Sequence, residues 1–361
     1  MKKICFFLTD ASDEGGIQRV ITELSNHFVN GYEIWIVSIF YKDSNDISIL
    51  PYKLNKNVNF KGFINKNTTH NKIIKKIKTL FAISKLYFFL KKQKVDVLIA
   101  NGMESVMLSF LPACLNRLKY ICCDHTSFDR KPLWARLGRK LSLMFAHSIV
   151  VLTASDARAW NNVKVNIIPN PSPYSNETIS APYSQRTKRI IAVGRLVQVK
   201  GFDRLLNIWK KFVTQHPDTP YCLEIIGSGP LRESLSNRIE NVGIANATIS
   251  TFTSDIAKIY NDSQLILMTS YHEGLAMVLI EAQAFGLPAL AYDVSGPSEV
   301  IVDGETGYLV ENGDEDQFIS KLSTLLNNDA LRNEMSGKCP EYSYRFKIDV
   351  IAEKWKRLFE A

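Results

Sequence analysis

Short apolar runs alternate with helical stretches along all 361 residues, and this alternation limits the fold more than any other feature. The runs are apolar at consecutive positions, which is typical of parallel strands that helices cover on both faces. We expect strands at 4–9, 33–39, 95–100, 120–123 and 148–152, then at 189–193, 222–226, 264–268 and 289–292. This pattern predicts an α/β fold of two doubly wound, Rossmann-like domains, with the cleft between them as the default ligand site.

A proline-rich segment, Pro169-Asn170-Pro171-Ser172-Pro173, separates the two series of strands. Proline fits neither a central strand nor a helix interior, so we interpret the segment as the start of a linker. The expected parts are a first domain over 1–170, a linker over 171–188 and a second domain over 189–341. The last stretch, 342–361, has apolar residues near helical spacing, and we expect one helix that packs back onto the first domain.

Composition excludes several classes of protein. Hydrophobic residues make up 46% of the chain and charged residues 22%, which is ordinary for a globular protein. The six cysteines show no Cys-x-x-Cys spacing, so a disulfide framework or a zinc ribbon is not expected, and a reducing cytoplasm fits. The first apolar run is too short for a signal peptide, and no run reaches the length of a membrane span. We expect a cytoplasmic protein that is soluble or lies on a membrane surface.

Positive charge is concentrated in the first half of the chain. Residues 1–182 carry 25 Lys and Arg against 13 Asp and Glu, whereas the remainder carries 19 against 23. Residues 47–95 contain twelve lysines and no acid. Within them, the spacing of apolar residues over 71–94 predicts one or two amphipathic helices. Such a helix suits an anionic membrane surface, although a packing helix with a solvated lysine face fits equally well. Nucleic-acid binding is not expected, since no aromatic platform accompanies the charge. The lysines that would face the membrane or acceptor are Lys72, Lys75, Lys76, Lys78 and Lys85.

Two glycine-containing loops follow expected strands in the second half. Gly194 and Arg195 come after the first of these strands, and Lys200 opens the next helix, an arrangement that can place two cations on a phosphate. An ordinary basic surface loop is the alternative. Gly227-Ser228-Gly229 follows the next strand, but Arg232 stands where a dinucleotide fingerprint needs glycine. The interpretation that we keep for this loop is a tight turn that lets a ligand approach the backbone.

Residues 271–281 are the most informative stretch. Glu281 interrupts an apolar segment, and a carboxylate there is costly unless it accepts hydrogen bonds, for which sugar or ribose hydroxyls are suitable donors. With a helix from Gly274, Glu273 and Glu281 would lie about 12 Å apart along its axis. A ligand with hydroxyls at both ends and a diphosphate between them could span the two acids. Its phosphates would meet the N–H groups of Gly274, Leu275, Ala276 and Met277. An acid on an exposed helix face is the alternative for Glu281.

The spacing E-G-L-x-x-V-L-x-E over 273–281, with V-G-R-L…K-G before it and G-P-S-E-V-I…D-G-x-x-G after it, resembles family GT4, the retaining glycosyltransferases of the GT-B fold. The resemblance is strong over 189–312. It is thinner in the first half, through Gly15-Gly16-Ile17 and His125. Within the family, the residue usage resembles bacterial transferases that build O-antigen, capsule or lipopolysaccharide. Gln18 and Ser295 depart from the usual pattern.

The resemblance implies a role for each matching residue. Arg195 and Lys200 would neutralise the diphosphate leaving group. Glu273 would hold hydroxyls of the donor sugar, and Glu281 would hold the ribose. His125 would orient the donor sugar, with an ordinary turn histidine as the alternative. The remaining donor-site residues would be Gly15, Gly16, Gly194, Gly227, Gly274, Leu275, Ala276 and Met277.

The implied reaction is retaining transfer of a hexose or N-acetylhexosamine to a lipid-linked or saccharide acceptor. The donor would be a nucleotide diphosphate sugar, with UDP favoured, and the place of work the inner face of the cytoplasmic membrane. No metal is expected, because Asp314-Glu315-Asp316 precedes a helix and is interpreted as its cap. A sugar-nucleotide epimerase and a non-catalytic sugar-binding protein are the alternatives. An NAD-linked oxidoreductase is disfavoured by the incomplete glycine fingerprint.

Overall fold

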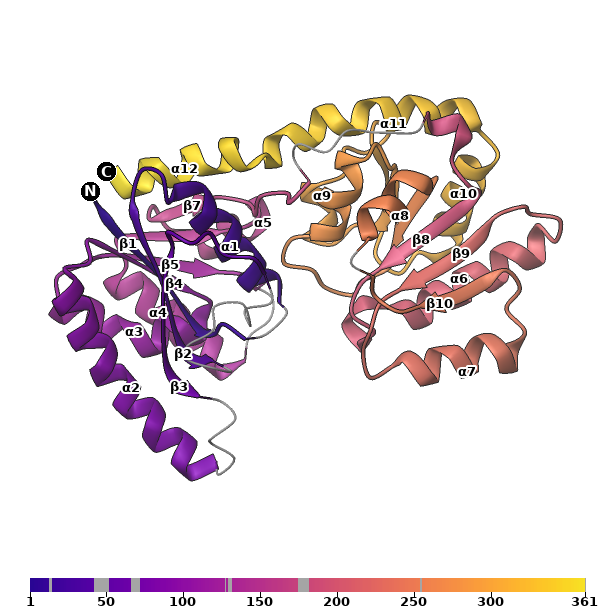
Figure 1. The fold of residues 1–361 in the computed structure, drawn as a ribbon. Coiled ribbons are helices and arrows are strands. Elements are labelled where there is room, and N and C mark those ends of the chain that lie inside the picture. The colour runs from indigo at the N-terminus through magenta and orange to yellow at the C-terminus, as the bar shows by residue number, and fades with distance from the viewer. Residues whose placement is uncertain are drawn as a thin grey trace. The chain divides into compact units, whose positions relative to one another are not determined.

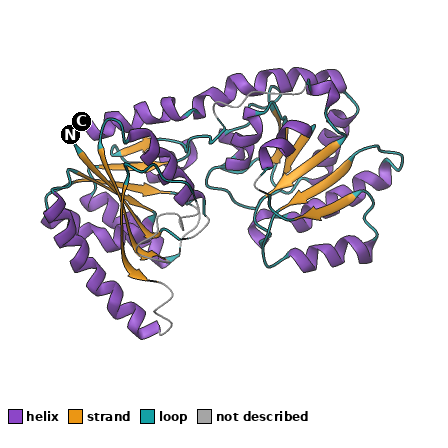
Figure 2. Ribbon diagram, viewed as in Figure 1, coloured by secondary structure: helices purple, strands orange, loops and turns teal. Residues whose placement is uncertain are grey.

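The computed structural model describes residues 1–12, 15–41, 52–65, 72–126, 128, 132–174, 182–253 and 255–360, with only the backbone given for 72–76. The chain forms two compact units. Unit 1 comprises Met1–Pro171 and Ile348–Ala361, and unit 2 comprises Ser172–Lys347. Each unit holds one parallel sheet with helices packed on it, which confirms the expected class of two doubly wound α/β domains (Figures 1 and 2).

The sheet of unit 1 has seven strands in the order β3-β2-β1-β4-β5-β6-β7, all paired in parallel. The strands are β1 Lys3–Asp10, β2 Glu33–Tyr41, β3 Asn59–Asn65, β4 Val97–Asn101, β5 Lys119–Asp124, β6 Ser148–Val151 and β7 Val165–Ile167. The order reverses between β1 and β4. Ligands of such sheets bind beyond the carboxyl ends of the strands, so this edge is where the unit 1 site is expected.

Two apolar cores cover the two faces of this sheet. Ile4 and Phe6 of β1 belong to one core and Cys5 and Phe7 to the other, because successive side chains of a strand point to opposite faces. Helices α1 (Gly16–Phe28) and α12 (Ile348–Glu360) cover the first face. The second face is covered by α2 (Lys72–Gln93), α3 (Met103–Leu115) and α4 (Leu133–Phe145), while α5 (Ala154–Trp160) contacts β7.

The C-terminal segment differs from the single helix expected over 342–361. Helix α11 (Asp329–Ser343) ends first, a 3-10 turn follows, and α12 starts only at Ile348. Trp355 and Phe359 of α12 are buried on the first face of the unit 1 sheet, and Phe359 meets Phe28 of α1 edge-to-face with 5.1 Å between ring centroids. The last helix therefore completes the core of the unit that contains the N-terminus (Figure 1).

The sheet of unit 2 has six parallel strands in the order β10-β9-β8-β11-β12-β13. The strands are β8 Arg189–Val193, β9 Cys222–Ile226, β10 Ala247–Ser250, β11 Leu265–Met268, β12 Ala289–Tyr292 and β13 Gly307–Val310. Its helices are α6 Phe202–Gln215, α7 Arg232–Val242, α8 Ile256–Asp262, α9 Met277–Ala284, α10 Glu315–Leu326 and α11. The core on one face includes Trp209 of α6 and Phe318 of α10, both fully buried.

Among the described residues, no helix combines the length and the apolar character that crossing a bilayer requires.

Candidate active site

Four loops meet at the carboxyl edge of the unit 2 sheet, and they carry most of the residues expected to bind the donor. They follow β8, β9, β11 and β12, and these strands are neighbours in the sheet. Backbone hydrogen bonds connect three of the loops: Gly194 N–H to Ile226 O (3.0 Å), Leu196 N–H to Ser228 O (2.9 Å) and Tyr271 N–H to Val199 O (2.9 Å). The edge is therefore one connected frame rather than a set of independent loops.

Lys200 and Glu273 form an ion pair in this frame, with 2.6 Å between Nζ and Oε1. Ser270 donates its hydroxyl to the same Glu273 oxygen, also at 2.6 Å. The pair stays in contact with solvent, since the Lys200 side chain is 22% exposed and that of Glu273 is 9% exposed. Two residues that the sequence assigned to phosphate and sugar thus bind each other here, and an incoming phosphate would compete with Glu273 for Lys200.

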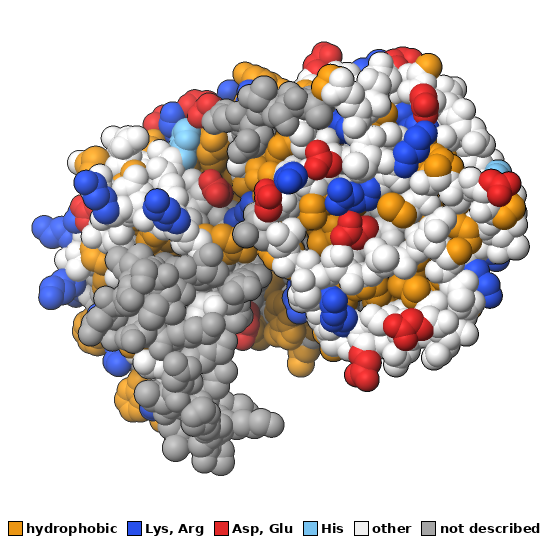
Figure 3. All heavy atoms as spheres, turned by 45° about the vertical axis from the view of Figure 1, so that its right-hand side comes forward, with side chains coloured by type: hydrophobic (Ala, Val, Ile, Leu, Met, Phe, Trp, Pro, Cys, Tyr) orange, Lys and Arg blue, Asp and Glu red, His pale blue; other side chains and the backbone are white. Residues whose placement is uncertain are grey.

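Arg195 lies on the same loop as Lys200 and is exposed. Its guanidinium makes no hydrogen bond or ion pair with another residue of the described chain. The loop after β8 therefore presents one cation without a carboxylate and one that shares a carboxylate. On the face drawn in Figure 3, acidic and basic side chains are interspersed over unit 2.

Packing between two loops explains the glycine at position 227 without a ligand. A Cβ at this position would lie 1.9 Å from the carbonyl oxygen of Gly194, so the loops after β8 and β9 pack this closely only with glycine. Direct contact of Gly227 with a ligand stays a prediction. At Gly194 itself, an added Cβ would stand 3.6 Å from the Lys200 stem, an ordinary contact.

The turn before α9 differs from the helix expected from Gly274. Helix α9 begins at Met277, so Gly274 to Ala276 lie before it, and this segment packs closely against Gly296. A Cβ on Gly296 would lie 2.6 Å from Cβ of Glu273 and 3.0 Å from the Ala276 nitrogen. Glu273 therefore does not share a helix with Glu281, and the expectation of about 12 Å along one helix axis was wrong.

Glu281 lies inside unit 2, and its side chain is not on an exposed helix face. The residue is 6% exposed, and its Oε2 accepts a hydrogen bond from the hydroxyl of Tyr260 on α8 at 2.9 Å. Tyr260 is itself fully buried. A buried carboxylate needs hydrogen-bond donors, and the hydroxyls of a sugar or ribose are suitable donors for it, as the Tyr260 hydroxyl is.

Arg204 holds the loop that carries Glu273, and no sequence pattern predicted this role. Its guanidinium lies between two aromatic rings, 4.1 Å from the centroid of Tyr271 and 4.2 Å from that of Tyr292. Its Nε and Nη2 donate to the carbonyl oxygens of Thr269 and Ser270. Burial lowers the pKa of Arg204 from its ordinary value, while the two tyrosines and Asp203 oppose that shift. The planar fork and stacking surface of arginine suit this position.

In unit 1, His125 follows β5 at the carboxyl edge of the sheet. Its Nε2 lies 3.2 Å from Oδ1 of Asn101, the last residue of β4. Its Nδ1 is buried without a hydrogen-bond partner among the described residues. Burial lowers the pKa of His125 to about 4, against an opposing effect of the Asp124 carboxylate. A neutral imidazole with one unpaired nitrogen is not the satisfied turn histidine that was the alternative.

A buried ion pair supports the chain on either side of His125. Asp124 and Arg139 of α4 meet at 2.7 Å, with exposed side-chain fractions of 2% and 7%. Arg139 also donates to the carbonyl oxygen of Phe128 and lies over its ring, 4.4 Å from the centroid. Asp156 accepts from the backbone N–H of Phe128 at 2.8 Å. The residues after β5 are therefore attached to two helices.

Gly15 and Gly16 lie at the start of α1, Gly15 as its N-cap. Among the described residues, a Cβ on Gly16 would meet no atom within 4 Å, and one on Gly15 would meet the flexible Gln18 side chain at 2.5 Å. Gln18 donates to the carbonyl oxygen of Asp10 at 2.7 Å, which ties the helix start to the end of β1. Protein packing does not demand glycine at Gly16, so close approach of a ligand stays the prediction for this pair.

The lysines expected to face a membrane lie on α2, a single helix over Lys72–Gln93. The side chains of Lys72, Lys75 and Lys76 lie outside the described part of the structure, Lys78 is half-buried and Lys85 is exposed. The apolar residues of this helix do not form one buried face. Ala82, Leu86 and Leu90 are buried against the sheet, whereas Ile77, Leu80, Phe81 and Phe88 are 49–66% exposed.

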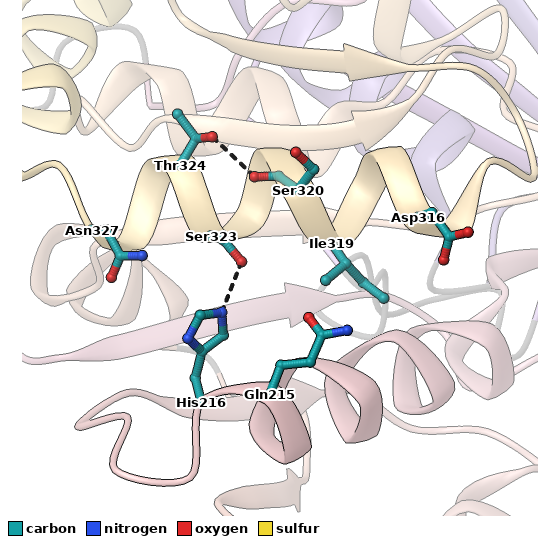
Figure 4. A pocket seen from close by; sticks show the side chains of 8 residues that line it. All are labelled: Gln215, His216, Asp316, Ile319, Ser320, Ser323, Thr324 and Asn327. Atoms are coloured by element: carbon teal, nitrogen blue, oxygen red, sulfur yellow. Dashed lines mark hydrogen bonds between the residues drawn. The ribbon is translucent and has the colours of Figure 1, made fainter.

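The Asp314-Glu315-Asp316 segment caps α10, as expected. Asp314 is the N-cap, and its Oδ1 accepts from the Gln317 N–H at 2.9 Å. Within the described ranges, no group of three or more His, Cys, Asp or Glu side chains is placed to hold a metal ion. A groove of about 650 Å³ lies between α6 and α10, but none of the expected site residues lines it (Figure 4).

Comparisons with known proteins agree with this geometry. The family "Glycosyl transferases group 1" matches residues 177–341, and "Glycosyltransferase Family 4" matches residues 14–173. An uncharacterized glycosyltransferase of Haemophilus influenzae is 30% identical over 99% of both chains. The amylovoran biosynthesis glycosyltransferase AmsD of Erwinia amylovora is 29% identical over 98% of this chain and 99% of its own. Among solved structures, TarM of S. aureus has a TM-score of 0.81 at 17% identity, with both chains fully covered.

The lipopolysaccharide outer core galactosyltransferase WaaB has a TM-score of 0.74 at 18% identity, over 99% of this chain and 98% of that one. The two doubly wound domains are those of the GT-B glycosyltransferases. The chain belongs to glycosyltransferase family 4, with a group 1 domain as its second half, and it is a transferase enzyme.

Proposed function

We propose that the protein transfers a hexose or N-acetylhexosamine, with retention of configuration, from a UDP-sugar to a lipid-linked or saccharide acceptor of a surface polysaccharide. The names of relatives support the acceptor class. They include AmsD and a Campylobacter jejuni α-1,4-N-acetyl-D-galactosaminyltransferase that acts on an undecaprenol-linked diphosphate, which is 24% identical over 99% of this chain. Fold neighbours crystallised with UDP support the base.

The observation that carries the proposal is the Lys200–Glu273 pair beside the unpaired Arg195 at the carboxyl edge of unit 2. Both cations lie on the loop after β8, so a diphosphate bound there gains two charge-assisted contacts. When the phosphate takes Lys200, the Glu273 carboxylate is released to accept hydroxyls of the donor sugar. Glu281, already held by Tyr260, accepts from the ribose.

In the transfer step, the bond from the anomeric carbon to the diphosphate oxygen breaks and a bond to the acceptor oxygen forms. For retention, the acceptor hydroxyl attacks from the face that the phosphate leaves, and its proton passes to that phosphate, so UDP is the second product. Arg195 and Lys200 stabilise the charge that develops on the leaving group. We propose that these cations serve in place of a divalent metal, so transfer should persist in EDTA. His125 orients the donor sugar.

Release of UDP, measured with and without a lipid-linked saccharide, tests this assignment. We expect release only when an acceptor is present, and expect Lys200→Ala and Glu281→Gln to lower it about 10²-fold or more. Glu281→Gln keeps an oxygen for the Tyr260 hydroxyl, which protects the fold. Lys338→Ala is the matched control, because Lys338 pairs with Glu334 within helix α11 and not with a residue of the carboxyl-edge loops. Sugar interconversion without acceptor would instead indicate an epimerase.

We also propose that unit 1 binds an anionic membrane surface through α2. Lysines near lipid headgroups contribute about 1 kcal/mol each, and apolar side chains add to this when they enter the interface. α2 offers both, because Lys85 is exposed beside Phe81 and Phe88 and the helix contains no acid. Exposed apolar side chains continue on the neighbouring helices: Leu111 and Leu115 of α3, and Leu133, Trp134, Leu137, Leu143, Met144 and Phe145 of α4.

A further inference from the structure

The orientation of the Asn101 side-chain amide is fixed by its own hydrogen bonds. Nδ2 of Asn101 donates to the carbonyl oxygens of Phe7 (3.3 Å) and Ile99 (3.1 Å). A carbonyl oxygen only accepts, so the end of the amide that faces these two atoms has to be the NH₂ group. The opposite end, Oδ1, therefore faces His125, and it does so as an acceptor.

This orientation determines which nitrogen of His125 carries the proton. Oδ1 of Asn101 lies 3.2 Å from Nε2 and accepts only, so Nε2 has to be the N–H donor. In a neutral imidazole the other nitrogen is then an acceptor, and here that nitrogen is the buried Nδ1, to which no described residue donates a hydrogen bond. Nδ1 is thus an acceptor whose hydrogen bond the described residues leave unfilled.

Burial keeps the His125 ring neutral against the effect of the adjacent carboxylate. Asp124 is the adjacent acid and favours protonation of His125, but Arg139 is paired with that carboxylate at 2.7 Å. Burial acts in the opposite direction and prevails, so the pKa of His125 falls to about 4. Above that pH the ring is neutral, and Nδ1 keeps its lone pair.

We propose that Asn101 is a positioning residue that holds His125 as the Nε2–H tautomer, so that Nδ1 accepts a hydrogen bond from a hydroxyl or amide N–H of the transferred sugar. The tautomer follows from the structure of unit 1 alone. The identity of the ligand as a sugar rests on the proposed function. In this arrangement His125 neither carries charge nor donates a proton to the substrate, because its one N–H is committed to Asn101.

Nitrogen NMR of the full-length protein labelled with ¹⁵N-histidine tests the tautomer directly, with His125→Gln to assign the signal. At pH 7 we expect one protonated nitrogen at Nε2 and a bare Nδ1. A protonated Nδ1 or an imidazolium at that pH would overturn the inference. Adding donor should shift the Nδ1 signal, whereas UDP alone should leave it in place. An unchanged Nδ1 at saturating donor, with turnover intact, would overturn the part of the proposal that concerns the ligand.

Asn101→Leu, which fills similar space without the amide, tests the positioning role. We expect a mixture of both tautomers and a fall in kcat/KM for the donor of about tenfold, the value of one lost hydrogen bond. Asn116→Leu is the matched control, because Asn116 also bonds two carbonyl oxygens through its amide but lies far from His125 in the fold of unit 1. A wild-type tautomer in Asn101→Leu would contradict the role of Asn101. If donor is not turned over at all, the proposed function fails while the tautomer measurement still stands.

Discussion

Each unit has an ion pair near the carboxyl edge of its sheet, and the two pairs have almost equal distances. Arg139 and Asp124 in unit 1 meet at 2.7 Å, and Lys200 and Glu273 in unit 2 meet at 2.6 Å. They differ in their surroundings. The first pair is nearly sealed from solvent, with exposed fractions of 7% and 2%, whereas the second has fractions of 22% and 9%.

The difference shows that distance alone does not tell whether an ion pair is accessible to a ligand. Arg139 also donates to the carbonyl oxygen of Phe128, and the pair is buried, so a ligand cannot easily take the place of Asp124. Lys200 has an ammonium group that is open to water, and a diphosphate could take the place of Glu273. An ion pair can exchange its carboxylate for a ligand only if solvent reaches the cation and the protein does not hold the cation by further contacts.

The largest effect on stability is expected when the sealed pair is broken. Arg139→Met leaves Asp124 buried without its cation, which should cost about 3–5 kcal/mol in the free energy of unfolding. Urea denaturation measures this loss. The double variant Arg139→Met with Asp124→Asn should recover much of it, because no unpaired charge remains. The corresponding change in unit 2, Lys200→Met, should leave the unfolding midpoint nearly unchanged. An equal loss in both variants would contradict the comparison.

Arg204 allows a test of the solvent-accessible pair in unit 2, because it supports the loop that carries Glu273. Arg204→Ala removes the support of the Thr269 and Ser270 carbonyls, which should displace Glu273 and lower kcat/KM by about 10²-fold. Arg204→Lys should not restore activity, since lysine lacks the planar fork that stacks between Tyr271 and Tyr292. Arg238→Ala is the control, because the hydrogen bond of Arg238 on α7 goes to the exposed Asn207 and not to the loop that carries Glu273. Full activity in Arg204→Ala would show that the loop keeps its shape unaided.

The smallest effect is expected for the lysines of α2, a helix with no carboxylate of its own. Lys78→Glu with Lys85→Glu should weaken binding to vesicles that contain anionic lipid by about tenfold or more. Co-sedimentation measures this binding. Lys338→Glu with Lys356→Glu makes the same change in net charge on other helices and serves as the control. Equal weakening by both pairs would mean that net charge alone attracts the protein to lipid.

Sequence patterns located the inner strands of both sheets and missed the outer ones. The strands β8, β9 and β12 have the bounds that were expected. The four strands that were not expected are β3, β7, β10 and β13, and these are the edge strands of the two sheets. An edge strand is covered less completely, so it can carry polar residues, as in the Asn59–Asn65 sequence NFKGFIN, and it lacks the continuous apolar run that marks a buried strand.

The sequence predicts those site residues that follow an inner strand with a continuous apolar run. Arg195 and Lys200 lie on the loop after β8 and Glu273 on the loop after β11, so their placement at one edge follows from parallel strand order. Arg204 was not found, because an arginine in the first turns of a helix has the pattern of a surface cation. Its partners Tyr271 and Tyr292 lie far away in the sequence, and only the pairing of β11 with β12 brings their loops together. The start of α9 also differs from the expected one, and the close packing of the preceding segment against Gly296 is a contact that the local sequence does not reveal.

The return of α12 to unit 1 has a consequence for how the chain is made. Ile351, Ala352, Trp355 and Phe359 of α12 are buried in a core whose other buried members lie between Ile4 and Ile168. A ribosome that has finished the first 171 residues has therefore not yet supplied every side chain of that core, and it must synthesise the whole of unit 2 first. Premature termination within the final helix would leave the earliest-made half of the enzyme with an uncovered apolar face, while the later-made half keeps its own core intact.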